Sequence, residues 1–325
     1  MKTRVAVIYG GRSGEHEISI RSAKSIMAGL DRQRYDVSEY FIDPGGKWSP
    51  RPIQPEPGAH PEIDVVFPVL HGTFGEDGTV QGLLELADLP YVGANVLASA
   101  VSMDKEMTKR VCIERGLPVV EYVVLRRDGI DADAVCRSLP FPMFVKPANL
   151  GSSVGISKVR NRAELEPALR LAAEFDRKVI VERGIEGKEL ECAVLGNDHP
   201  EAATPCEILP SKEFYDYEDK YLLDRAQFKL PAELSATQTA EVRRLAVECY
   251  RAVECEGMAR VDFLLEAATG RLYINEINTI PGFTSISMYP KMWESAGVPF
   301  PALLDRLIAL ALERHAARHA TRFSR

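Results

Sequence analysis

The segment of residues 260–278 constrains the fold of this chain most, because its residue alternation predicts two strands joined by a turn. Glu276 and Asn278 are two residues apart, so their side chains project to the same face of the second strand. A loop with an odd number of residues, or a bulge, would bring Asp262 of the first strand opposite Glu276. Two carboxylates and one amide oxygen would then converge at one end of the hairpin.

These three oxygen donors, with no base among them, favour Mg²⁺ held together with the phosphates of a substrate. Arg260 precedes Asp262 by two residues and adds a positive charge on the same face. The alternation places Leu272 and Ile274 on the parity of Glu276. The alternative interpretation is the polar outer face of an ordinary amphipathic hairpin.

Composition narrows the class of protein. The chain has 325 residues, of which 46% are hydrophobic and 27% charged, enough for two or three domains. A net charge of −7 argues against a nucleic-acid binder held by bulk electrostatics. Six scattered cysteines without a C-x-x-C pair indicate reduced thiols in the cytoplasm, and six dispersed histidines argue against a zinc site. We find no signal peptide and no apolar run of membrane-spanning length, and we therefore expect no membrane partner.

The chain divides into three predicted units. Residues 1–95 alternate strands and helices as in a small open α/β domain, with strands at 4–9, 35–42 and 64–70 and helices at 13–30 and 78–87. Residues 96–187 predict an α+β unit with helices at 102–115 and 163–175 and strands at 121–125, 143–146 and 179–182. Residues 188–325 predict a strand at 188–195, a helix at 236–254, the hairpin and a closing helix from residue 300.

A second functional signal is the Gly- and Ser-rich turn at residues 146–155, which follows a strand ending at Lys146. Backbone N–H groups and hydroxyls in such a turn can wrap phosphate oxygens, and the lysine supplies a point charge. A simple hairpin turn with an edge lysine is the alternative. The chain contains no P-loop motif, so a different ATP-binding fold is expected.

Other charged positions allow more than one interpretation. The glycine-rich residues 10–17 lack the G-x-G-x-x-G pattern, which weakens a dinucleotide-binding role. Glu15 there either caps a helix or holds the ammonium group of a small substrate. Lys105 at a helix start fits a second phosphate ligand. Glu182 and Glu189 suit an adenine amino group and ribose hydroxyls, or are solvated loop carboxylates.

Together these motifs resemble those of the D-alanine–D-alanine ligases in the ATP-grasp superfamily, over residues 5–312. The matching segments are residues 10–19, 71–79, 102–105, 146–155, 214–221, 260–262 and 276–282. The resemblance implies an ATP-grasp fold that combines α/β and α+β units behind an N-terminal open α/β domain. It also implies ligation of two D-alanines through a D-alanyl phosphate, for peptidoglycan precursor synthesis.

The resemblance assigns roles residue by residue. It implies metal ligands for two Mg²⁺ ions, which Mn²⁺ can replace: Asp262, Glu276 and Asn278. It implies ATP contacts by Lys105, Lys146, Ser153, Glu182, Ile185, Glu189 and Lys220. The catalytic set is Glu15, Ser152, Tyr221 and Arg260, and the substrate pocket adds His71, Gly282, Ser287 and Met288. A cytoplasmic homodimer is the usual form in the family.

The choice of substrate is less constrained. The segment 214–221 with Tyr221 favours D-alanine over D-lactate as the second substrate, while D-serine stays open. Two other functions are kept as hypotheses: a nucleotide-binding regulator without chemistry, and an ATP-grasp ligase that joins another acid and amine.

Overall fold

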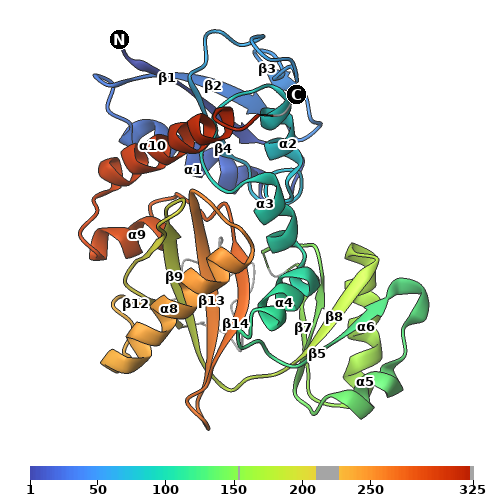
Figure 1. The fold of residues 1–325 in the computed structure, drawn as a ribbon. Coiled ribbons are helices and arrows are strands. Elements are labelled where there is room, and N and C mark those ends of the chain that lie inside the picture. Colours follow the sequence, from blue (N-terminus) through green and yellow to red (C-terminus); the bar gives the residue numbers. More distant parts are fainter. Residues whose placement is uncertain (153, 210–226, 323–325) are drawn as a thin grey trace.

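The computed structural model describes residues 1–152, 154–209 and 227–322, and its strands form three separate sheets (Figure 1). The N-terminal sheet has the order β3-β2-β1-β4, with β1 (Thr3–Gly10) parallel to both β2 (Tyr35–Ile42) and β4 (Val65–Val69). β1 and β4 are almost continuously apolar, as expected for parallel strands covered on both faces. The short β3 (Trp48–Ser49) pairs antiparallel at the edge, and the helices are α1 (His16–Gly29) and α2 (Thr79–Leu86).

The second sheet is antiparallel and has the order β5-β8-β6-β7. Its strands are β5 (Tyr122–Arg126), β8 (Lys178–Arg183), β6 (Met143–Pro147) and β7 (Ser157–Val159). Helix α6 (Arg162–Phe175) packs Leu165 and Leu169 into the core of this unit, beside α5 (Ala132–Ser138). A single 3₁₀ turn, η1 (Arg127–Gly129), follows β5. The sequence analysis did not predict α5 or β7, because both are short.

The expected single helix over residues 102–115 is wrong. Two helices occupy this region, α3 (Val96–Met103) and α4 (Lys105–Glu114), and they meet at Asp104. Asp104 has an extended backbone, and its carboxylate accepts hydrogen bonds from the N–H groups of Glu106 and Met107, both at 3.1 Å. This N-cap starts a new helix at Lys105 and leaves Ser102 at the end of the preceding one.

The third sheet carries the predicted hairpin. Its order is β12-β11-β9-β13-β14, and it contains β12 (Gln227–Lys229), β11 (Cys206–Leu209), β9 (Gly187–Leu195), β13 (Met258–Glu266) and β14 (Leu272–Asn278). The small β10 (Glu201–Ala202) also pairs with β9, and α8 (Ala236–Ala252) covers one face of the sheet. A capping box between Ser235 and Gln238 fixes the start of α8.

A β-bulge in this hairpin confirms that Asp262 lies opposite Glu276. Asp262 pairs with Glu276, but the next residue, Phe263, pairs with Ile274, so Asn275 is an extra residue on β14. The bulge also corrects the simple alternation. Ile274 is buried in the core below the sheet, whereas Glu276 lines a pocket on the other face.

The closing helices return to the N-terminal sheet. After α9 (Met288–Ser295), helix α10 (Phe300–His319) packs on α1 and β4 (Figure 1). Gly29 permits this approach, because a Cβ there would lie 2.5 Å from the Phe300 ring. Among the described residues no single helix is long and apolar enough to cross a membrane, although α9 and α10, bent by 104°, pass that test as a pair. The predicted unit limits at residues 95 and 187 stay predictions.

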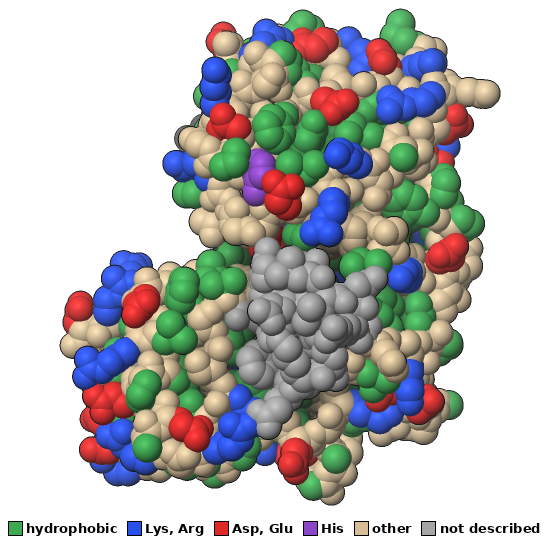
Figure 2. Space-filling view, turned by 180° about the vertical axis from the view of Figure 1, so that it is seen from behind, with side chains coloured by type: hydrophobic (Ala, Val, Ile, Leu, Met, Phe, Trp, Pro, Cys, Tyr) green, Lys and Arg blue, Asp and Glu red, His purple; other side chains and the backbone are tan. Residues whose placement is uncertain are grey.

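The distribution of charged side chains on the surface is consistent with the net charge of −7. Figure 2 shows acidic and basic side chains interspersed over the described residues of one face. All six cysteines are unpaired, and five of them are buried. Their burial fits the expected reduced thiols.

Candidate active site

The hairpin places its charged residues against one another. Arg260 donates two hydrogen bonds to the carboxylate of Asp262, at 2.7 and 2.6 Å. Its guanidinium also lies 3.3 Å from the carboxylate of Glu191 on β9. Burial alone would lower the pKa of Arg260, but the charges of Asp262 and Glu191 raise it well above its ordinary value. Arg260 is therefore a permanent, oriented cation at this point of the sheet.

The three predicted metal ligands fit a hard divalent cation. Asp262 and Glu276 face each other across the two strands, and both are oxygen donors. In this structure side-chain cations lie beside them, Arg260 on Asp262 and Lys105 at 3.5 Å from Glu276. The Oδ1 atom of Asn278 accepts from the Ile280 N–H at 3.0 Å and retains a second lone pair. The donor chemistry thus matches Mg²⁺ or Mn²⁺ rather than a metal that prefers nitrogen or sulfur.

A buried cluster of opposite charges lies beside the hairpin. Lys146 on β6 contacts one oxygen of Glu182 at 2.6 Å, and Lys109 on α4 lies 3.0 Å from the other oxygen. Lys146 also lies 3.4 Å from Oδ1 of the bulged Asn275. Burial alone would raise the pKa of Glu182, but the two lysines lower it to about 2. Glu182 is therefore an ionised carboxylate inside the protein.

Two alternatives from the sequence are wrong here. Glu182 is only 2% exposed, so it is not a solvated loop carboxylate. Lys146 is buried too, on a strand with neighbours on both sides, so it is not an edge lysine. Glu189 on β9 is half-buried and lines the same pocket as Glu182 and Lys146. Ile185 lies in the connection between β8 and β9.

A second set of polar groups comes from the N-terminal sheet. Glu15 precedes α1, but its side chain makes no cap hydrogen bond, so the capping interpretation is wrong. Instead its carboxylate accepts a hydrogen bond from the hydroxyl of Ser152, a residue with a left-handed backbone (φ 55°). Gly72 lets the loop after β4 come close, because a Cβ there would lie 2.8 Å from a carboxylate oxygen of Glu15.

His71 lines the same pocket as Glu15 and is held by hydrogen bonds on both ring nitrogens. Its Nδ1 lies 3.0 Å from the Ile280 carbonyl and its Nε2 lies 3.1 Å from the Ser22 hydroxyl. Glu76 lies 3.8 Å from His71 Nδ1. Burial lowers the pKa of His71, but the charge of Glu76 raises it above its ordinary value; burial and the charge of Glu15 raise the pKa of Glu76. Glu76 and Glu15 therefore set the electrostatic surroundings of His71.

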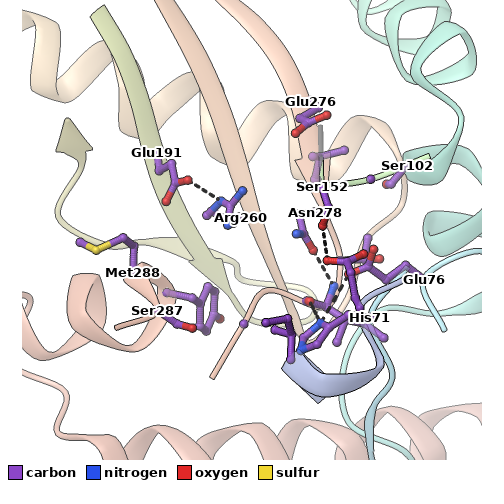
Figure 3. A pocket seen from close by; sticks show the side chains of 18 of the residues that line it. His71, Glu76, Ser102, Ser152, Glu191, Arg260, Glu276, Asn278, Ser287 and Met288 are labelled. Carbon is purple, nitrogen blue, oxygen red and sulfur yellow. Dashed lines mark hydrogen bonds and ion pairs between the residues drawn. The ribbon is translucent and has the colours of Figure 1, made fainter. Parts of the chain in front are cut away.

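The expected second-substrate residues close the far side of this pocket. Ser287 Oγ accepts from the Thr284 N–H at 3.0 Å, which fixes the turn before α9. Gly282 has no space for a side chain, since a Cβ would lie 2.7 Å from Ser287 Oγ. Met288 begins α9 and is buried, with its side chain at the pocket wall (Figure 3).

Two adjoining pockets result. One is lined by Glu15, His71, Ser152, Gly282, Ser287 and Met288, and we call it the amino-acid pocket. The other is lined by Lys146, Glu182, Glu189, Asp262 and Asn275, and we call it the nucleotide pocket. Glu191, Arg260 and Glu276 line both pockets, and Figure 3 shows them on neighbouring strands. The two pockets therefore meet at these three residues.

The sequence analysis missed some of these residues. Glu191 is two residues from Glu189, and this acidic pair on one face of a buried strand was the available signal. Glu76 lies in the matching segment 71–79 but was given no role. Lys109 lies inside a predicted helix, and nothing in the sequence around it indicates a functional role. Ser153, Lys220, Tyr221 and the segment 214–221 lie outside the described residues.

Comparisons with known proteins agree with this geometry. The family model described as "D-ala D-ala ligase C-terminus" matches residues 111–309, and "D-ala D-ala ligase N-terminus" matches residues 4–60 and 50–94. The chain is 73% identical to the D-alanine–D-alanine ligase of Solibacter usitatus, with both chains fully covered. It is 44% identical to D-alanine–D-alanine ligase A of Salmonella typhimurium, covering 98% of each chain.

Solved structures extend the likeness to the fold. The D-alanine–D-alanine ligase of Coxiella burnetii has a TM-score of 0.87 at 40% identity, covering 98% of this chain and 96% of that one. The VanG D-Ala:D-Ser ligase of Enterococcus faecalis has a TM-score of 0.88 at 36% identity, covering 96% and 100%.

Proposed function

This chain belongs to the D-alanine–D-alanine ligase family, and we propose how its residues divide the reaction among them. The enzyme has the ATP-grasp fold and joins two D-alanines with ATP, releasing ADP and phosphate. The dipeptide serves peptidoglycan precursor synthesis. A carboxylate is a poor electrophile, and its conversion to D-alanyl phosphate provides a good leaving group. The protein must therefore position the phosphoryl group and neutralise its charge.

The nucleotide pocket holds ATP. Lys105 and Lys146 contact its phosphates. Lys146 lines the nucleotide pocket, and Lys105 reaches it from the amino-acid pocket, 3.5 Å from the shared Glu276. Glu182 and Glu189 receive the adenine amino group and the ribose hydroxyls. Ser153, Ile185 and Lys220 complete this set, as the resemblance implies. Asp262, Glu276 and Asn278 hold two Mg²⁺ ions, which when bound neutralise charge on the phosphates; Mn²⁺ can replace them.

The amino-acid pocket holds the two substrates. Glu15 binds the ammonium group of the first D-alanine, and the hydroxyl of Ser152 orients that carboxylate. His71 supports Glu15 from behind. Gly282, Ser287 and Met288 shape the place of the second D-alanine. Tyr221 joins the set of Glu15 and Ser152, in agreement with the resemblance.

Arg260 acts at the junction, which is the place where the nucleotide pocket and the amino-acid pocket meet. When the amine of the second D-alanine attacks the acyl phosphate, negative charge develops on the carbonyl oxygen. A preoriented guanidinium stabilises this oxygen without having to reorganise. The observation that carries the proposal is that Arg260 and Glu276 line both pockets, so the phosphoryl group and the amino acid meet there.

We also propose the domain limits, the cellular location and the oligomeric state of the enzyme. The three units are residues 1–95, 96–187 and 188–325, with the active site between them. The enzyme is a cytoplasmic homodimer whose partners are small molecules.

The test measures ADP release from ATP and Mg²⁺ with D-alanine as the only amino acid, and identifies the product by mass spectrometry. D-alanyl-D-alanine formed in step with ADP is expected. Parallel reactions contain L-alanine, D-alanine with D-lactate, and D-alanine with D-serine, since one similar structure is a D-Ala:D-Ser ligase. ADP release without D-alanyl-D-alanine would contradict the assignment of the second substrate.

A further inference from the structure

We infer that Asp88, His315 and His319 form a binding site for a divalent transition-metal ion of the Zn²⁺ class. The three side chains place their ligand atoms within 4.8 Å of one another. None of them lines the amino-acid pocket or the nucleotide pocket. The site is thus separate from the ligase reaction. The sequence shows the two histidines four residues apart, but Asp88 lies more than 200 residues before them.

The spacing of the donors suits a metal. His315 and His319 are one helical turn apart near the end of α10, so both rings lie on one face. Their Nε2 atoms lie 3.2 and 2.8 Å from the same carboxylate oxygen, Oδ1 of Asp88. Metal bonds of about 2.0–2.1 Å in a tetrahedron separate two ligand atoms by roughly 3.3 Å. Small side-chain shifts would therefore admit an ion among the three atoms.

The backbone that carries the Asp88 carboxylate is held by hydrogen bonds before any ion binds. Asp88 follows α2 and has a left-handed backbone, with φ 55°. Its N–H donates to the Glu85 carbonyl at 3.2 Å, and the Leu89 N–H donates to the Leu84 carbonyl at 3.1 Å. These bonds close the end of α2 in the manner of a helix C-cap. Asp88, in the turn after α2, therefore reaches both histidines near the end of α10.

Nearby cations are engaged by other groups. Arg314 donates to the Tyr91 carbonyl at 2.7 Å and lies over the Tyr91 ring. Arg318 pairs with Glu85. Their charges are therefore partly compensated next to the proposed site.

The donor set selects the class of ion. Two imidazole nitrogens and one carboxylate favour Zn²⁺, Co²⁺ or Ni²⁺ over Mg²⁺, which prefers oxygen ligands. The side chains of His315, His319 and Asp88 are 26%, 53% and 41% exposed. Water can therefore reach the ion and complete its coordination. A bound ion would cross-link the end of α10 to the turn after α2, which lies more than 200 residues earlier in the sequence.

The test titrates the full chain with Co²⁺ in an excess of Mg²⁺, which occupies the oxygen site of the hairpin. The readouts are the visible absorption of bound Co²⁺ and the melting temperature with Zn²⁺. The wild type should bind one Co²⁺ with a nitrogen-ligand spectrum, and Zn²⁺ should raise its melting temperature.

Variants locate the ion. His319→Ala and Asp88→Asn should weaken Co²⁺ binding by about tenfold or more and abolish the Zn²⁺ shift, while metal-free melting and ligase turnover persist. His199→Ala is the matched control, since His199 is exposed elsewhere on the chain, and it should bind like the wild type. Equal Co²⁺ binding by all four proteins would overturn the proposal. Absence of binding to the wild type would overturn it as well and leave the cluster as an ion pair at a helix C-terminus.

Discussion

The nucleotide pocket and the amino-acid pocket are built in different ways. In the nucleotide pocket, Lys146 and Glu182 come from the adjacent strands β6 and β8, so strand pairing brings them together. In the amino-acid pocket, Glu15 and Ser152 are 137 residues apart, and His71 contacts Ile280 across 209 residues. Strand pairing thus places this buried pair of the first pocket, whereas both polar contacts of the second pocket join segments far apart in the sequence.

The difference extends to electrostatics. The nucleotide pocket buries full charges and balances them with close partners, as Glu182 does with two lysines. The amino-acid pocket relies on hydrogen bonds around His71 and on the shape of the turn at Ser287. We therefore expect changes in the first pocket to affect both folding and turnover. Changes at Gly282, Ser287 and Met288 in the second should mainly alter substrate choice.

The largest loss of turnover should come from a change at the residues that line both pockets. Glu276→Ala removes one of two facing carboxylates, and turnover should fall by on the order of 10³ or more. Steady-state ADP release at saturating ATP and D-alanine measures this loss. Glu241→Ala, which breaks an exposed pair with Arg244 on α8, should leave turnover unchanged. Normal turnover in Glu276→Ala would refute the metal assignment.

The next effect concerns the buried charges. Glu182→Ala leaves Lys146 and Lys109 without their shared carboxylate and should cost about 3–5 kcal/mol in the free energy of unfolding. Denaturant titration of both proteins measures the difference. A loss below about 1 kcal/mol would mean that water or another group compensates the lysines.

The same variant has a defined pH dependence. The pKa of Glu182 is lowered to about 2 in the folded protein, below the ordinary value of about 4.3 in an unfolded chain. Its stabilising contribution is therefore complete above the unfolded value and is lost as the pH falls toward 2. The stability difference between wild type and Glu182→Ala should shrink over that range. A constant difference would contradict the ionised state of Glu182.

A smaller effect should follow from Glu191→Gln, which weakens one of the two carboxylate contacts of Arg260. We expect kcat to fall by roughly tenfold while KM for ATP changes little, because Glu191 acts by positioning Arg260 and is not among the proposed ATP contacts. The control is Glu207→Gln, a buried carboxylate paired with Lys188 that lines neither pocket. An equal loss in both variants would indicate a general effect on the sheet.

The smallest effect should be that of Met288→Leu in the amino-acid pocket. The swap conserves volume, so it should cost less than about 1.5 kcal/mol in transition-state binding. The ratio of D-alanyl-D-alanine to D-alanyl-D-serine in a competition experiment measures any change. A reversed preference would show that Met288 alone selects the second substrate.

Local patterns predicted much of this molecule. The alternation in residues 260–278 predicted the hairpin, with Asp262 opposite Glu276 if the loop was odd or a bulge was present, and the apolar runs predicted the parallel N-terminal sheet. The bulge at Asn275 could not be placed, because alternation does not reveal which strand holds the extra residue. The break at Asp104 was missed, since a capping aspartate inside an otherwise helical stretch resembles a surface residue.

Groups assembled by tertiary contacts were harder to predict. The roles of Glu76 and Glu191 follow from their contacts with His71 and Arg260, which lie on other segments of the chain. The pairing of Asp88 with the histidines of α10 depends on the return of that helix to the N-terminal sheet. Such contacts between distant segments cannot be predicted from a single sequence.

The central claim is that phosphoryl transfer and peptide-bond formation occur at one junction through an acyl phosphate. The most direct test uses D-alanine labelled with ¹⁸O in its carboxylate and examines the released phosphate by mass spectrometry. If the carboxylate attacks the γ-phosphorus and the amine then displaces phosphate from carbon, one labelled oxygen passes to each phosphate formed with a dipeptide. Phosphate without label, in a reaction that still yields D-alanyl-D-alanine, would contradict the account.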